Sequence, residues 1–179
     1  MSFAKKMIGL VAGVALVATP VAMAVAPAQA APAAKATGTT LISFKKEYAG
    51  IIKLIKPIPP AEFIGSRISF PVTGVTGKTI THSGGLEIGG VPATDPVIVV
   101  NSKKKTATIS LTVGGNLTPL FYAEHFKVKA GGGKATVWQG DLHLTKDETL
   151  VGLLNQLIPG GSLTPGLGLG QIRVTYRVN

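Results

Sequence analysis

The chain has 179 residues, no cysteine, and 18 lysine and arginine residues against 8 acidic residues, a net charge of +10. The lack of cysteine excludes a disulfide scaffold and thiolate zinc sites, and the length is that of a single domain. The positive charge favours anionic surroundings. Because the basic residues are scattered and no aromatic residues interleave with them, we expect no nucleic-acid partner.

Residues 1–30 have the three-part pattern of a secretory signal peptide. Lys5 and Lys6 precede an apolar run, and Ala28-Gln29-Ala30 fits a small-residue cleavage site. A membrane anchor is the weaker alternative because prolines and alanines interrupt the run. Cleavage would leave 16 basic and 8 acidic residues, a net charge of +8. We therefore expect a secreted protein, associated with the cell envelope at most, with no membrane span after signal removal.

A flexible leader is expected over residues 31–40, and a single folded domain over 41–179. The first periodic segment places Phe44, Tyr48, Ile51, Ile52 and Ile55 on one face of a helix. The prolines at 57, 59 and 60 should end this helix. The β-branched residues over 51–55 leave a strand open as the alternative there.

Alternating apolar residues predict a series of short strands separated by turn residues. A hairpin turn is predicted at Asn101–Lys104, with lysines at its exposed tip, and a second turn at Gly131–Gly133. A final helix is predicted over 145–158, begun by a capping box from Thr145 to Glu148. The expected strands are 66–73, 78–89, 96–101, 105–114, 121–129, 134–144 and 170–178. This order predicts a mainly β fold, an antiparallel β-sandwich or barrel-like domain with one or two short helices.

The stretch from Arg67 to Val100 contains the most suggestive local feature. Its second alternating run is broken by Gly84-Gly85, close to His82. Glycines within a strand pattern predict a bulge, a bend, or a place where another group approaches the backbone. His82 and Ser83 cannot form a catalytic pair on a strand, because neighbouring side chains point to opposite faces.

Motifs for catalysis are lacking. The sequence has no pair of carboxylates suited to glycoside hydrolysis, no nucleophile elbow and no phosphate loop. His125 and His143 are expected on polar-facing strand positions at the surface. We therefore expect a protein that is not an enzyme.

The residues around His82, from Phe70-Pro71-Val72-Thr73-Gly74 to Thr79–Leu86, resemble a module of secreted actinobacterial proteins, the HtaA-type domain. The similarity continues through the following strands, the 145–158 helix and the final Gly168–Thr175 segment, and covers most of 41–178. Members of this family that are well studied bind haem. The resemblance implies that Tyr48, which follows a Ser-Phe pair, is the iron ligand, and that His82 supports it.

Three interpretations remain open for function. The first is a secreted, non-catalytic binding module with Tyr48 and His82 at a haem site. The second is a structural or adhesive envelope protein with no small-molecule site, held by its basic charge to anionic wall polymers. In that case Tyr48 packs in the core and His82 bonds a loop carbonyl. The third, an enzyme, has the least support.

Overall fold

The computed structural model describes residues 34–158, 160 and 162–179. The predicted signal peptide lies outside the described residues. Among those residues, no helix has the length and apolar character needed to cross a bilayer.

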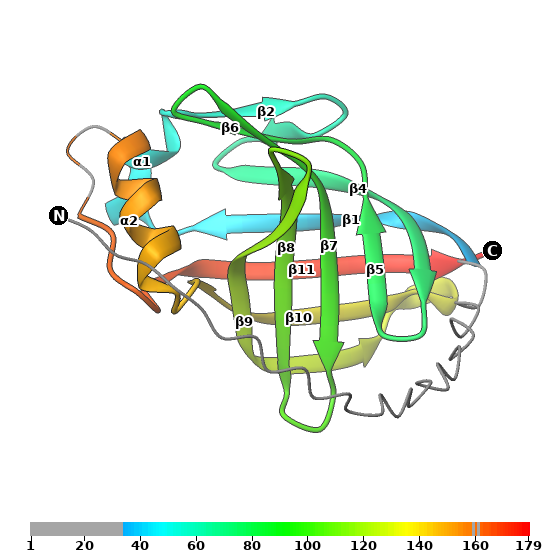
Figure 1. The fold of residues 1–179 in the computed structure, drawn as a ribbon. Coiled ribbons are helices and arrows are strands. Elements are labelled where there is room, and N and C mark those ends of the chain that lie inside the picture. Colours follow the sequence, from blue (N-terminus) through cyan, green and yellow to red (C-terminus); the bar gives the residue numbers. More distant parts are fainter. Residues whose placement is uncertain (1–33, 159, 161) are drawn as a thin grey trace, which may run out of the picture. The chain divides into compact units, whose positions relative to one another are not determined.

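The described part of the chain is built mainly from strands (Figure 1). Between the first two strands lie a 3₁₀ turn, η1 (Lys46–Tyr48), and a single-turn helix, α1 (Ala49–Ile52); η2 (Gly132–Lys134) follows β9, and α2 (Glu148–Leu157) precedes the last strand. The strands are β1 (Ala34–Phe44), β2 (Ile55–Ile58), β3 (Glu62–Ile64), β4 (Arg67–Thr76), β5 (Thr79–His82), β6 (Gly85–Ile88), β7 (Val91–Asn101), β8 (Thr106–Val113), β9 (Asn116–Ala130), β10 (Thr136–Leu144) and β11 (Gly168–Val178).

Eight of these strands close into an antiparallel barrel. Their order is β7-β5-β4-β1-β11-β10-β9-β8, and pairing of β8 with β7 completes the ring. The accessory strands β2, β3 and β6 extend the sheet beside it. The sequence left a sandwich and a barrel open, and the β7–β8 pairing decides for the barrel.

The barrel interior is filled by alternate side chains of its strands. An eight-stranded barrel is just wide enough for side chains to fill it. Ile68, Phe70, Ile98, Ile172 and Val174 are each at most 2 % exposed. Alternation of this kind places the polar neighbours of these residues on the outer wall of the barrel.

The glycine pair beside His82 redirects one strand. β5 pairs with β4 as far as His82, whereas β6 leaves β4 and pairs with β2. Gly84 has a φ of +84°, and a Cβ there would lie 2.5 Å from the amide nitrogen of Ala61. A Cβ on Gly85 would collide with the Ala93 carbonyl oxygen. The predicted close approach to the backbone is therefore confirmed at both glycines.

Two expectations for the start of the domain are wrong. The leader expected over 31–40 is part of β1 from Ala34 onward, because Ala36 and Thr40 alternate inward and are buried. The helix expected after Ser43 is reduced to η1 and α1. Phe44 ends β1 and Ile55 begins β2, so the apolar spacing that imitates a helical face comes from two strand ends flanking one helical turn.

The predicted capping box is also wrong, because α2 begins three residues later than expected. Asp147 is the N-cap, and its Oδ1 accepts from the Leu150 amide at 3.1 Å. Thr145 instead accepts from the Asp147 amide at 3.3 Å. Thr145 therefore orders the turn before the helix rather than the helix itself.

Asp147→Ala is expected to lower the free energy of unfolding by about 1 kcal/mol, because it removes this cap and leaves an amide of the first turn unbonded. Thermal unfolding followed by circular dichroism would measure the change. Glu148→Ala is the control, since Glu148 makes no capping bond among the described contacts. Equal unfolding temperatures in the two variants would contradict the assignment.

Candidate functional site

A small apolar cavity lies at the end of the barrel where β1 and β10 finish and β11 starts. The helices α1 and α2 lie at this end (Figure 1), and both contribute side chains to the cavity wall. Its volume is about 40 Å³, enough for a water molecule but not for a larger ligand. The lining residues are Phe44, Tyr48, Ile51, Ile52, Ile55, Ile88, Phe121, Leu144, Leu154, Ile158, Leu163 and Leu169. Among these side chains, the Tyr48 hydroxyl is the one polar group.

Tyr48 is held at the junction of η1 and α1, where its side chain is half-buried. Burial raises the pKa of its phenol above the ordinary value of 10.0, and the neighbouring Glu47 raises it further. The phenol therefore carries its proton at neutral pH. Loss of that proton requires a cation at the hydroxyl to offset the desolvation.

The side chains of η1 and α1 hold this part of the wall weakly. Neither element contains a fully buried residue. Lys45, Lys46 and Lys53 are exposed around Tyr48. Segments with few buried apolar side chains open at low free-energy cost, so a ligand could displace this part of the wall at low cost.

His82 lies inside the barrel, 4 % exposed, and both of its ring nitrogens are bonded. Nδ1 lies 2.8 Å from the Pro96 carbonyl oxygen, which can only accept, so Nδ1 carries the proton. Nε2 then accepts from the Thr40 hydroxyl at 2.7 Å. Burial lowers the pKa of His82 from 6.5 to about 4, although the bond to Pro96 opposes this shift. The ring is therefore neutral at pH 7.

The structure does not bring Tyr48 and His82 into contact. His82 lines a second space of about 10 Å³ deeper in the barrel, and Phe121 is the residue common to both linings. The sequence-based alternative, in which His82 bonds a loop carbonyl, is met in part, because the carbonyl it bonds is that of Pro96 within strand β7. The roles of the two residues toward a ligand stay predictions.

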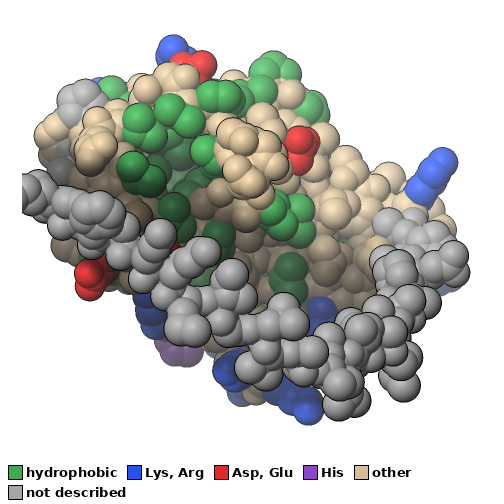
Figure 2. Space-filling view, viewed as in Figure 1, with side chains coloured by type: hydrophobic (Ala, Val, Ile, Leu, Met, Phe, Trp, Pro, Cys, Tyr) green, Lys and Arg blue, Asp and Glu red, His purple; other side chains and the backbone are tan. Residues whose placement is uncertain are grey.

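An apolar groove runs along α2 next to the cavity. It has a volume of about 370 Å³ and shares Ile88 and Leu154 with the cavity lining. Leu153, at the groove, is 51 % exposed. Figure 2 shows hydrophobic side chains gathered on the drawn face of the molecule. The groove, unlike the cavity, reaches the range of about 300–1,000 Å³ typical of small-molecule sites.

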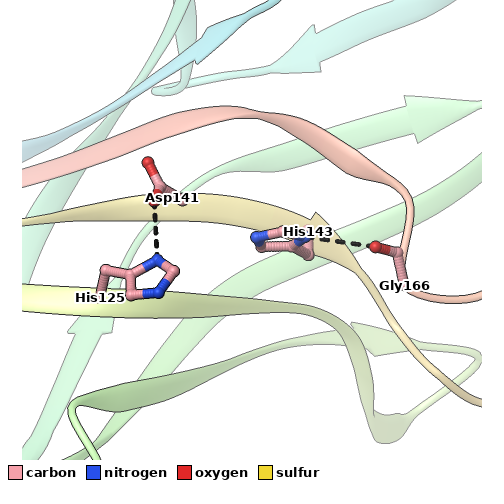
Figure 3. Close-up of polar contacts among 4 residues, drawn as sticks. All are labelled: His125, Asp141, His143 and Gly166. Carbon is pink, nitrogen blue, oxygen red and sulfur yellow. Dashed lines mark hydrogen bonds and ion pairs between the residues drawn. The ribbon is translucent and has the colours of Figure 1, made fainter.

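The other two histidines lie on the outer wall, as expected (Figure 3). Nδ1 of His125 lies 3.0 Å from Oδ2 of Asp141, and Nδ1 of His143 donates to the Gly166 carbonyl at 3.2 Å. His143 also stacks on Tyr122, with 5.0 Å between ring centroids. Within the described residues, no three His, Asp or Glu side chains are placed to hold a metal ion.

Sequence analysis missed most of the cavity wall. Phe121, Leu144 and Leu169 come together through the pairing of β10 with β9 and β11, and Leu163 from the segment before β11 completes this part of the wall. Their individual positions could be recognised as apolar, but their meeting at one barrel end depends on long-range pairing. Tyr48, found from the Ser-Phe pair, is the one predicted site residue that lines this cavity.

Comparison with solved structures finds a similar fold in the haem-binding protein HtaB from Corynebacterium glutamicum. The two chains share 12 % sequence identity with a TM-score of 0.55, and the match covers 81 % of this chain and 94 % of that one. No family model and no curated protein matches the sequence. At this identity the similarity shows the fold alone.

Proposed function

We propose that the protein is a non-catalytic binding module that takes a flat apolar ligand of the haem type at the α1–α2 end of the barrel. The observation that carries the proposal is the phenol of Tyr48 on the rim of a cavity whose other lining side chains are all apolar. The similar fold of the haem-binding protein HtaB supports it. Export and envelope association, inferred from residues 1–30, belong to the same proposal.

The residues at this end fit the chemical groups of haem. A tyrosine phenolate is a known axial ligand of haem iron, and the apolar wall suits the porphyrin faces. Lys45, Lys46 and Lys53 are exposed near Tyr48 and could meet the propionates. The 40 Å³ cavity is too small in this conformation, so α1 must move outward to admit the ligand.

Haemin added to the full chain is expected to give the absorption band of a ferric–tyrosinate complex. Tyr48→Phe is expected to abolish this band and weaken binding by about tenfold or more, because loss of a ligand should cost at least as much as loss of a supporting residue. Absorption titration measures both quantities. Tyr122→Phe is the matched control. Tyr122 lies on the outer wall beside His143, so this variant should bind haemin as the wild type does.

An unchanged spectrum in Tyr48→Phe would remove Tyr48 from the site. Absence of any haemin binding by the full chain would remove the proposal.

A supporting role for His82 is a separate part of the proposal. In that role, the His82 ring would give up its hydrogen bond with the Thr40 hydroxyl and bond the Tyr48 phenol instead. Phe121, which lines both the cavity and the deeper space beside His82, would have to move aside. His82→Gln should then weaken haemin binding, whereas Thr40→Val, which frees Nε2, should not. Equal binding by wild type and both variants would restrict His82 to the core.

A further inference from the structure

All three arginines of the chain lie on one outer wall of the barrel, whereas the cavity lies among inward-facing side chains at one end. Arg67 is on β4, and Arg173 and Arg177 are on β11, with β1 between these strands (Figure 1). The inward side chains of β11 are Ile172, Val174 and Tyr176, so the arginines alternate outward and are exposed. The sequence separates Arg67 from Arg173 by more than a hundred residues.

The strand register sets the spacing of these charges. Arg67 pairs with Ser43, and Ser43 pairs with Gln171, which places Arg67 two strands and two residues from Arg173. With about 4.8 Å between strands and about 3.3 Å per residue, the Cα atoms are about 12 Å apart. Arg173 and Arg177 are about 13 Å apart along β11. Arg67 and Arg177 are two strands and six residues apart, about 22 Å between Cα atoms, so one small anion cannot contact all three arginines, whereas an extended polymer can.

The arginines are available to an external anion. Within the described residues, no arginine forms an ion pair with a carboxylate. The Arg177 guanidinium donates to the Gly132 carbonyl oxygen at 3.4 Å. The carboxylate of Asp141, which lies opposite Gln171 in the β10–β11 pairing, already bonds His125. Guanidinium groups bind carboxylate and phosphate through two parallel hydrogen bonds, so each arginine can bind one anionic group in this bidentate way.

Two hollows flank Arg173 and line up along β11. The larger, about 460 Å³, reaches Arg177 and the backbone of Gly131 and Gly132. The smaller, about 190 Å³, reaches Arg67. The side chains around them include the hydroxyls and amides of Thr37, Ser43, Gln139, Gln171 and Thr175. Such groups both donate and accept hydrogen bonds, as the hydroxyls of a sugar chain require.

We propose that this wall binds a linear anionic polysaccharide, with the arginines on its charged groups and the neutral polar side chains on its hydroxyls. Single-stranded nucleic acid fits less well, because no exposed aromatic side chain lines the two hollows for base stacking. A membrane surface fits less well, because the side chains between the arginines are mostly polar. The surface is separate from the barrel-end cavity, and the proposal does not depend on haem binding.

Binding of the full chain to immobilised polygalacturonate at low salt tests this proposal. Arg173→Gln, the residue common to both hollows, is expected to weaken binding about three- to tenfold and to elute at lower salt. Lys103→Gln removes the same charge at the exposed β7–β8 turn and should elute like wild type. Neutral dextran should retain none of the three proteins.

Several results would overturn the proposal. One is the absence of retention on polygalacturonate at low salt. Another is an equal loss in Arg173→Gln and Lys103→Gln, which would show binding by net charge alone. Tighter, Arg173-dependent binding to a single-stranded DNA or to phosphatidylglycerol vesicles would reassign the wall to that partner.

Discussion

Gly38→Ala is expected to destabilise the barrel by about 3 kcal/mol, the upper end of the usual cost of overpacking. Gly38 lies on β1 opposite Tyr176 on β11. A Cβ there would collide with the Thr175 carbonyl oxygen and lie 2.6 Å from the Cα of Tyr176. Because both obstacles belong to the backbone, two strands of the ring must separate to admit one methyl group. Urea unfolding followed by Trp138 fluorescence would measure the loss.

Gly50→Ala is the matched control for that substitution. A Cβ on Gly50 meets nothing within 4 Å, and Gly50 lies in α1. Alanine favours a helix over glycine by up to about 1 kcal/mol, so this variant should be unchanged or slightly more stable. Similar unfolding midpoints for the two variants would show that the ring tolerates a wider β1–β11 spacing.

The free energy of unfolding should fall by about 3 kcal/mol through His82 as the pH is lowered from 6.5 to 4. Burial lowers the pKa of His82 to about 4 in the folded protein, against 6.5 when unfolded. Between these values the unfolded chain binds a proton that the folded barrel excludes, so stability is present above pH 6.5 and is lost progressively down to pH 4. Below pH 4 this contribution is constant.

His82→Gln isolates that contribution from the other titrating groups. Glutamine carries both a donor and an acceptor but no titratable proton. The difference in unfolding free energy between wild type and His82→Gln, measured by urea unfolding at several pH values, should shrink between pH 6.5 and pH 4. A constant difference over that window would mean that the folded protein protonates His82 as readily as the unfolded chain does.

Local patterns predicted the strands well because period-2 alternation and turn residues act over short distances. The Asn101–Lys104 turn and the Gly131–Gly133 turn separate the strands expected on either side. The start of the domain was harder, because the inward positions of the first half of β1 are Ala36, Gly38 and Thr40 rather than large apolar residues. Its burial comes from β4 and β11, which are distant in sequence.

The candidate sites were less predictable than the strands. Tyr48 lies on an apolar stripe that predicts a helix, but the stripe also includes Phe44 at the end of β1 and Ile55 at the start of β2. The burial and neutral state of His82 follow from Thr40 and Pro96, which the sequence does not place beside it. The arginine wall depends on pairing between β4, β1 and β11, although the alternation in β11 already separates its arginines from its core residues.

Ring closure also limits how one molecule can join another. Among the described strands, β2 and β3 are the ones that pair along a single side, with β6 and β4 respectively. They have four and three residues, and β2 contains Pro57. Where β9 continues past β8, it presents Lys127 and Lys129. Short, proline-bearing or lysine-bearing edges offer little template for a further strand, so the topology of the described strands leaves few backbone groups open to amyloid-like pairing.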